Sequence, residues 1–98
     1  MKSRVVLGGL ALAGVVGAWT AAGAADDPGQ TLYDRHCGQC HGAEGRGGKG
    51  PRLVPFEWSY EAALELVRRP LCDMPPIPES EVSDADVAQI VAYLKTIK

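Results

Sequence analysis

The sequence is short, has few aromatic residues and lacks any excess of basic charge. Six aromatic residues among 98 positions are too few to form stacking platforms along a nucleic-acid strand. Residues 26–98 hold eight Lys and Arg against twelve Asp and Glu, a formal charge of −4, which argues against nucleic acid as a partner. The length allows one domain at most and excludes many α/β enzyme folds. No stretch shows the sustained apolar/polar alternation of a β-sandwich.

The first 25 residues have the composition of a secretory signal peptide. A basic start and an apolar stretch are followed by small residues suited to cleavage after Ala24 or Ala25. The alternative is an uncleaved membrane anchor, because residues 5–25 carry no charge over a length that can span a bilayer. Either outcome predicts that residues 26–98 work outside the cytoplasmic membrane, and that the protein contacts a membrane only if the leader is kept.

The remainder of the chain predicts an all-α domain of three main helices joined by loops rich in Gly and Pro. The helices are expected over about residues 28–40, over about residues 60–69 and from residue 83 onward, with Asp27, Ser59 and Ser83 as N-caps. Five glycines in residues 42–52 predict a loop after the first helix. A domain of this size builds a thin core and usually needs disulfides or a metal to stabilise it.

Residues 37–41, Cys-Gly-Gln-Cys-His, form the attachment pattern of c-type haem. Two thiols at this spacing, at the end of a helix, lie close enough to add to the two vinyl groups of one haem. The histidine that follows is then held beneath the iron as its proximal ligand. We therefore expect Cys37 and Cys40 to bind the haem covalently and His41 to bind its iron.

Other interpretations of these cysteines are weaker. A zinc site would need about two further ligands, and only Cys72 and His36 remain. A thioredoxin-like dithiol needs a βαβ setting that the chain lacks, and a disulfide between Cys37 and Cys40 would close a very small, strained loop. The odd cysteine, Cys72, is either a contact with another protein chain or, more simply, a half-buried thiol.

Met74 is the best candidate for the second axial ligand of the iron. Haem ligands come mainly from His, Met, Cys or Tyr. Once Met1 leaves with the leader, Met74 is the only methionine, while His36 adjoins Cys37 on the proximal side. Met74 stands in a proline-rich loop, which can hold a weak thioether ligand in place. The alternative is a methionine that fills a gap in the core.

From Gly29 to Lys98 the chain resembles a small single-haem bacterial cytochrome c of the His/Met type. In that family a glycine and an aromatic residue of the first helix cross the last helix, and Gly29 and Tyr33 match those positions. Residues 91–95 also resemble the last helix of the family. The resemblance implies the small cytochrome c fold and one covalently attached haem c.

The resemblance adds two residues to the expected haem site. The family places a proline after the attachment motif whose carbonyl accepts a hydrogen bond from the proximal histidine, and Pro51 matches it. Trp58 matches a tryptophan that donates to a haem propionate in some relatives, although a core aromatic is an equal alternative. The expected cofactor-binding set is therefore Cys37, Cys40, His41, Pro51, Trp58 and Met74.

The function implied is one-electron transport in the periplasm between Fe(II) and Fe(III), without enzymatic activity of its own. No Ser/His/Asp set, carboxylate pair or open metal site suggests bond chemistry in this sequence. The expected partners are redox proteins, either a dehydrogenase or a membrane oxidase or reductase. One alternative is a dedicated cytochrome subunit of a periplasmic dehydrogenase. Another is a haem enzyme or gas sensor in which Met74 leaves the iron.

Overall fold

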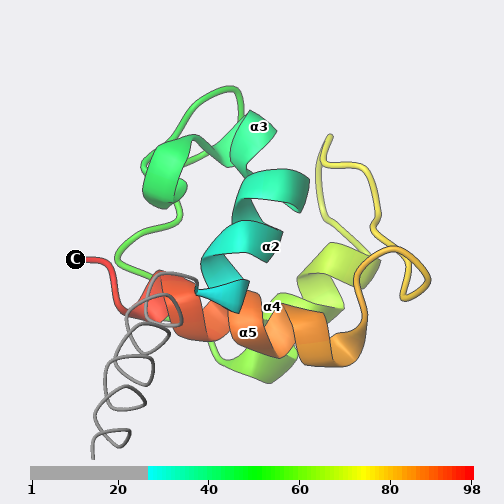
Figure 1. Cartoon of the computed structure of the whole chain (residues 1–98). Helices are drawn as coiled ribbons and strands as arrows, with labels where there is room; N and C mark the ends of the chain where they lie inside the picture. The colour runs from blue at the N-terminus through cyan, green and yellow to red at the C-terminus, as the bar shows by residue number, and fades with distance from the viewer. Residues whose placement is uncertain (1–26) are drawn as a thin grey trace, which may run out of the picture.

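The computed structural model describes residues 27–98, so the predicted signal peptide and its cleavage site lie outside the described residues. Within this range the chain folds into helices and loops, without strands (Figure 1). The elements are α2 (Pro28–His36), α3 (Gly38–His41), the 3-10 turn η2 (Ala43–Gly45), α4 (Tyr60–Arg68) and α5 (Asp84–Lys95). The all-α fold class predicted from the sequence is confirmed.

The three longer helices begin at the N-caps that the sequence predicts. The side chains of Asp27 and Ser59 each accept a backbone N–H bond from the first turn of their helix, α2 and α4 respectively. Before α5, Ser83 and Asp86 form a reciprocal capping box, in which each side chain accepts the backbone N–H of the other residue at 3.1 and 3.3 Å. Local side-chain chemistry therefore determines where each of these helices starts.

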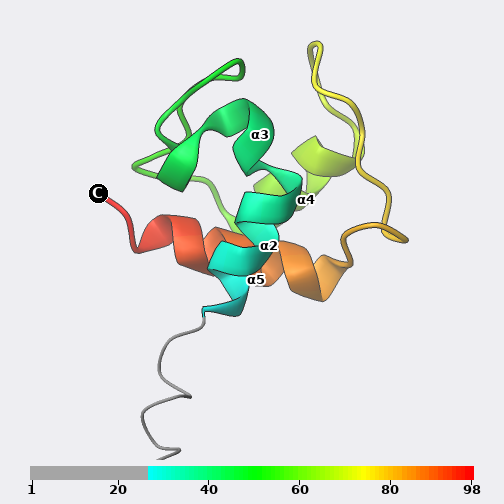
Figure 2. The same ribbon diagram turned by 45° about the horizontal axis from the view of Figure 1, so that its top comes forward.

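The first helix is shorter than the sequence predicts. It ends at His36, and Cys37 leaves the helical region with φ −123° and ψ −30°, although its N–H still bonds to the carbonyl of Tyr33. A separate turn, α3, begins at Gly38 and runs in a different direction (Figure 2). A continuous helix through Cys40 is therefore wrong, because the chain bends inside the Cys-Gly-Gln-Cys-His motif.

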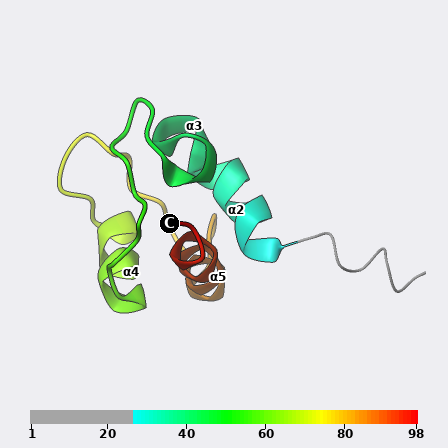
Figure 3. The same cartoon turned by 90° about the vertical axis from the view of Figure 1, so that its left-hand side faces the viewer.

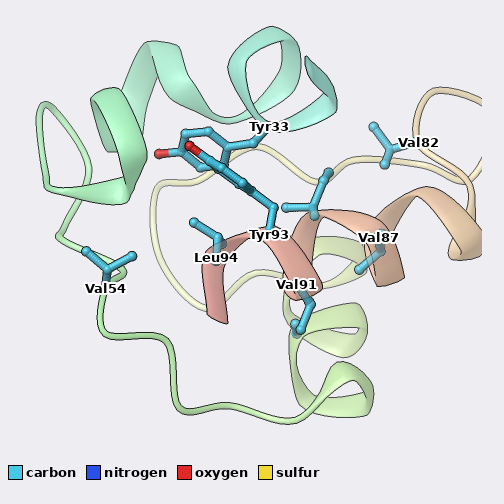
Figure 4. Packing of buried hydrophobic residues seen from close by; sticks show 9 residues of the cluster. Tyr33, Val54, Val82, Val87, Val91, Tyr93 and Leu94 are labelled. Atoms are coloured by element: carbon cyan, nitrogen blue, oxygen red, sulfur yellow. The ribbon is translucent and has the colours of Figure 1, made fainter. Parts of the chain in front are cut away.

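Helix α5 lies between α2 and α4 and packs against both (Figure 3). At the crossing of α2 with α5, a Cβ added to Gly29 would overlap the carbonyl oxygen of Gln89 and lie 2.8 Å from the Cβ of Tyr93. One turn later, the fully buried ring of Tyr33 lies 5.8 Å from the ring of Tyr93, centroid to centroid (Figure 4). Glycine permits this close helix approach because it has no side chain.

The buried core is small and apolar. In the described residues it comprises nine side chains, five of them on α5 (Figure 4): Tyr33, Val54, Ala63, Val82, Val87, Ile90, Val91, Tyr93 and Leu94. Such a core gives little stability to a domain of this length. Several half-buried apolar side chains that pack against this core also border a cavity, among them Leu53, Phe56, Val67 and Ile77.

Candidate functional site

A cavity of about 850 Å³ is bordered by α3, α4, α5 and the two loops that flank α4. Its volume is at the upper end of the range of about 300–1,000 Å³ that is typical of pockets for small molecules and cofactors. The walls are mainly apolar, and the side chains of the helices and loops that form them include Leu53, Phe56, Ala63, Leu66, Val67, Ile77, Val82, Val87, Ile90, Val91 and Leu94. The cavity therefore fits a large apolar group better than a small polar ligand.

All six site residues expected from the sequence border this one cavity. They are Cys37, Cys40, His41, Pro51, Trp58 and Met74. They come from three stretches of chain: the motif around α3, the loop before α4 and the segment of residues 70–76 after it. Figure 2 shows that the loop after α3, in green, and the segment of residues 70–76, in yellow, both rise on the same side of α5.

The imidazole of His41 is oriented by a backbone carbonyl. Its Nδ1 lies 2.8 Å from the carbonyl oxygen of Pro51. A carbonyl oxygen can only accept a hydrogen bond, so Nδ1 must carry the proton and donate it. The other ring nitrogen, Nε2, is then left with its lone pair, which is the form of histidine that binds a metal. The contact with Pro51 therefore leaves Nε2 of His41 available to bind a metal.

The glycine-rich loop brings Pro51 to His41 by folding back over α3. The turn ends at His41 because Gly42 has φ 83°, a conformation that residues with a side chain rarely adopt. The carbonyl of His41 then accepts the N–H of Gly47 at 2.7 Å, and the carbonyl of Cys40 accepts the N–H of Gly50 at 2.6 Å. The loop thus satisfies the free carbonyls at the end of the turn and places the proline carbonyl beside the histidine ring.

The two cysteines of the motif differ in environment. Cys37 is half-buried and Cys40 is exposed, and both border the cavity. Burial, with a smaller contribution from Cys40, raises the pKa of the Cys37 thiol from 9.0 to about 11. Among residues 27–98, no three His, Cys, Asp or Glu side chains gather closely enough to hold a metal ion by themselves.

Two residues on the cavity rim are more exposed than expected. Cys72 is exposed, so the prediction of a half-buried thiol is wrong. The physical reason is that residues 70–76 stand away from the helices, and Leu71 beside it is 84% exposed (Figure 1). Trp58 is 48% exposed, with its ring 6.4 Å from that of Phe56, so it is not part of the buried core.

Most of the residues that form the cavity wall were not predicted from the sequence. The helical spacing of Ala63 and Val67 predicted an apolar face on α4, but that pattern looks the same whether the face packs on protein or on a cofactor. Arg52 also borders the cavity, and its Nε donates to the carbonyl of Val54 at 2.6 Å.

None of the helices in the described part of the chain is long and apolar enough to cross a membrane.

A helical domain that encloses a large apolar cavity beside a Cys-Gly-Gln-Cys-His motif defines the class of c-type cytochrome domains. The comparison with protein families agrees. The family described as "Cytochrome C oxidase, cbb3-type, subunit III" matches residues 24–94, and the chain belongs to this family. Its cofactor is therefore a covalently attached haem c.

Several curated proteins are similar in sequence. The chain is 41% identical over 91 residues to a protein named dihydro-heme d1 dehydrogenase from Pseudomonas aeruginosa. The alignment covers 88% of this chain and 18% of that protein. It is 35% identical over 69 residues to the cytochrome c subunit of 4-cresol dehydrogenase from Pseudomonas putida, covering 70% of this chain and 59% of that protein. It is 28% identical over 75 residues to a subunit of cbb3-type cytochrome c oxidase from Rubrivivax gelatinosus. That alignment covers 70% of this chain and 25% of that protein.

The chain thus spans less than two thirds of the length of each of these three relatives. No solved structure matches it significantly.

Proposed function

We propose that this chain is an exported one-electron carrier. In this proposal Cys37 and Cys40 hold the haem by thioether bonds, and His41 and Met74 are the axial ligands of its iron. The observation that carries the proposal is that all four residues border one apolar cavity, in which the contact with Pro51 frees the Nε2 of His41. When bound, the haem iron supplies one-electron chemistry between Fe(II) and Fe(III).

The protein's own residues would adjust that chemistry in three ways. Pro51 fixes the orientation of the His41 ring and increases its basicity through the hydrogen bond to Nδ1. Met74 supplies a soft thioether, which favours Fe(II) and so raises the reduction potential. The apolar walls contributed by α4 and α5 exclude water and disfavour the extra positive charge of Fe(III). Ligation by His41 and Met74 would suit electron transfer, because the same two residues would stay bound to the iron in both oxidation states.

Redox proteins are the proposed partners, either a dehydrogenase or a membrane oxidase or reductase. Two of the similar proteins carry the name of a dehydrogenase, and a third is an oxidase subunit, which supports redox partners in general. We place the protein in the periplasm, with residues 1–25 as the signal peptide, removed after Ala24 or Ala25. In this proposal residues 26–98 form the cytochrome c domain and perform no bond chemistry themselves.

A dedicated cytochrome subunit of one dehydrogenase is a second candidate function. The similarity to the cytochrome c subunit of 4-cresol dehydrogenase favours it. Cys72 is exposed, so a second protein chain can reach its thiol, which is consistent with this candidate. Co-purification of a dehydrogenase with the native protein would favour this function over a freely diffusing carrier.

Spectra and ligand binding of the purified holoprotein test the proposed carrier. The haem should survive acid–acetone extraction, and the oxidised protein should show the weak far-red charge-transfer band of Met–iron ligation. Met74→Ala should lose this band, lower the reduction potential and bind carbon monoxide in the reduced state. Cys72→Ser, two residues earlier in the same segment, is the matched control and should behave as the wild type.

The opposite result is equally clear. If the wild type lacks the far-red band at neutral pH and binds carbon monoxide readily, the iron has an open site. The proposed function would then be that of a haem enzyme or gas sensor instead of an electron carrier.

A further inference from the structure

The segment that carries Met74 has few contacts of its own to hold it. Residues 70–76 lie outside the helices, and they make no backbone hydrogen bond with the described residues. Met74 itself is half-buried, while the neighbouring Cys72 and Pro75 are exposed. A thioether is a weak ligand of haem iron, so the position of Met74 depends on the contacts that hold the ends of the segment.

The C-terminal end of this segment is bonded to the last turn of α4. Ile77 lies three residues beyond Met74, and both of its backbone groups are engaged. Its N–H donates to the carbonyl of Val67 at 2.8 Å, and its carbonyl accepts from Nη1 of Arg68 at 3.0 Å. The two residues between Met74 and Ile77 are prolines with fixed φ, so this stretch is stiffer than an ordinary loop and the position of Ile77 restricts that of Met74.

The same guanidinium also reaches the start of α5. Nη2 of Arg68 donates to the carboxylate of Asp84 at 2.6 Å, and Asp84 is the first residue of that helix. The side chain of Arg68 is 21% exposed and that of Asp84 is 52% exposed, so only the arginine is shielded from water. Arg68 thus joins α4, the end of the Met74 segment and α5. Only the planar fork of an arginine presents two nitrogens in this fixed geometry.

We infer that Arg68 is a positioning residue that keeps Met74 on the iron by holding Ile77. This inference rests on the proposed ligation by Met74. The simpler alternative is an ordinary ion pair that adds only a little stability. The neighbouring residue Arg69 forms an ordinary surface ion pair of this kind. Its side chain is 78% exposed and lies 2.7 Å from that of Glu65, one turn earlier on α4. That pair does not join α4 to another element.

Arg68→Lys in the haem-loaded protein tests the inference. Lysine keeps the positive charge but lacks the fork that spans the carbonyl of Ile77 and the carboxylate of Asp84. Imidazole must displace Met74 to bind ferric iron, so we expect it to bind about tenfold more tightly to this variant. The far-red band should weaken and the midpoint potential should fall. Arg69→Lys is the matched control, and all three measurements should equal those of the wild type.

A second variant keeps the test decisive if Arg68→Lys does not fold. Asp84→Asn leaves Arg68 bonded to Ile77 but removes its charged partner, so imidazole should bind about threefold more tightly. If the wild type lacks the far-red band, Met74 is not the ligand and both proposals fail. If the wild type shows the band but Arg68→Lys and Asp84→Asn bind imidazole no more tightly than Arg69→Lys does, ligation by Met74 stands and the role of Arg68 is overturned.

Discussion

At the scale of single residues, Tyr33 connects the core with the haem-binding loop. Its side chain is fully buried, and its hydroxyl donates to the carbonyl of Gly42 at 2.7 Å. Burial raises the pKa of Tyr33 from 10.0 to about 12. The folded state therefore favours the neutral phenol more than the unfolded state does. This contribution to stability is complete below pH 10 and is lost as the pH rises towards 12.

Tyr33→Phe should lower the stability of the holoprotein by about 1 kcal/mol at neutral pH, because the hydrogen bond to Gly42 is lost. It should also make stability fall less steeply above pH 10. A smaller decline should remain, because burial raises the pKa of Tyr93 as well. Denaturant unfolding at neutral and alkaline pH measures both effects, with Tyr60→Phe as control. The same alkaline decline in Tyr33→Phe and wild type would show that Tyr33 does not cause it.

The residues proposed for the haem site differ in how visible they are in the sequence. Cys37, Cys40 and His41 were identified by spacing, because attachment chemistry fixes their separation along the chain. Met74 could be proposed because few other ligand types remained. Arg68 could not be proposed from the sequence. Its partners, Ile77 and Asp84, lie 9 and 16 residues further along the chain, and no local pattern connects them with it.

At the scale of elements, the crossing of α2 and α5 is the closest helix contact described above. Gly29→Ala would place a Cβ against the backbone carbonyl of Gln89, which cannot move without shifting α5. We expect a loss of about 1–3 kcal/mol, the usual cost of overpacking. Thermal unfolding of the holoprotein measures it. Gln30→Ala, at the next and exposed position, is the control, and equal unfolding temperatures for the two variants would mean that the helices do not cross so closely.

Helix starts could be predicted from the sequence, whereas the break in the first helix could not. Asp27, Ser59 and Ser83 bond to backbone groups two or three residues away, so a short stretch of sequence contains the whole interaction. The end of α2 at His36 has no such local signal. Residues 37–41 turn away from the helix axis where the glycine-rich loop bonds back onto α3, and this arrangement depends on contacts that only the folded chain makes.

At the scale of the whole molecule, the core and the haem cavity are largely the same structure. Six of the nine buried core residues also border the cavity: Ala63, Val82, Val87, Ile90, Val91 and Leu94. These side chains are almost fully buried by protein, and the same residues also form part of the cavity wall. An unfilled cavity of about 850 Å³ would leave the contact between α4 and α5 poorly supported. The haem is thus expected to be part of the hydrophobic core.

The chain should therefore lack a cooperative fold when it carries no haem. The double variant Cys37→Ala and Cys40→Ala, with any loosely bound haem extracted, should retain little fixed tertiary structure and show no sharp thermal transition by circular dichroism. Cys72→Ala removes an exposed thiol and leaves the attachment motif intact, so it should keep its haem and unfold sharply. A sharp transition in the haem-free double variant would show that nine buried side chains suffice. The cavity would then be a preformed binding site, whose walls take up their arrangement without the cofactor.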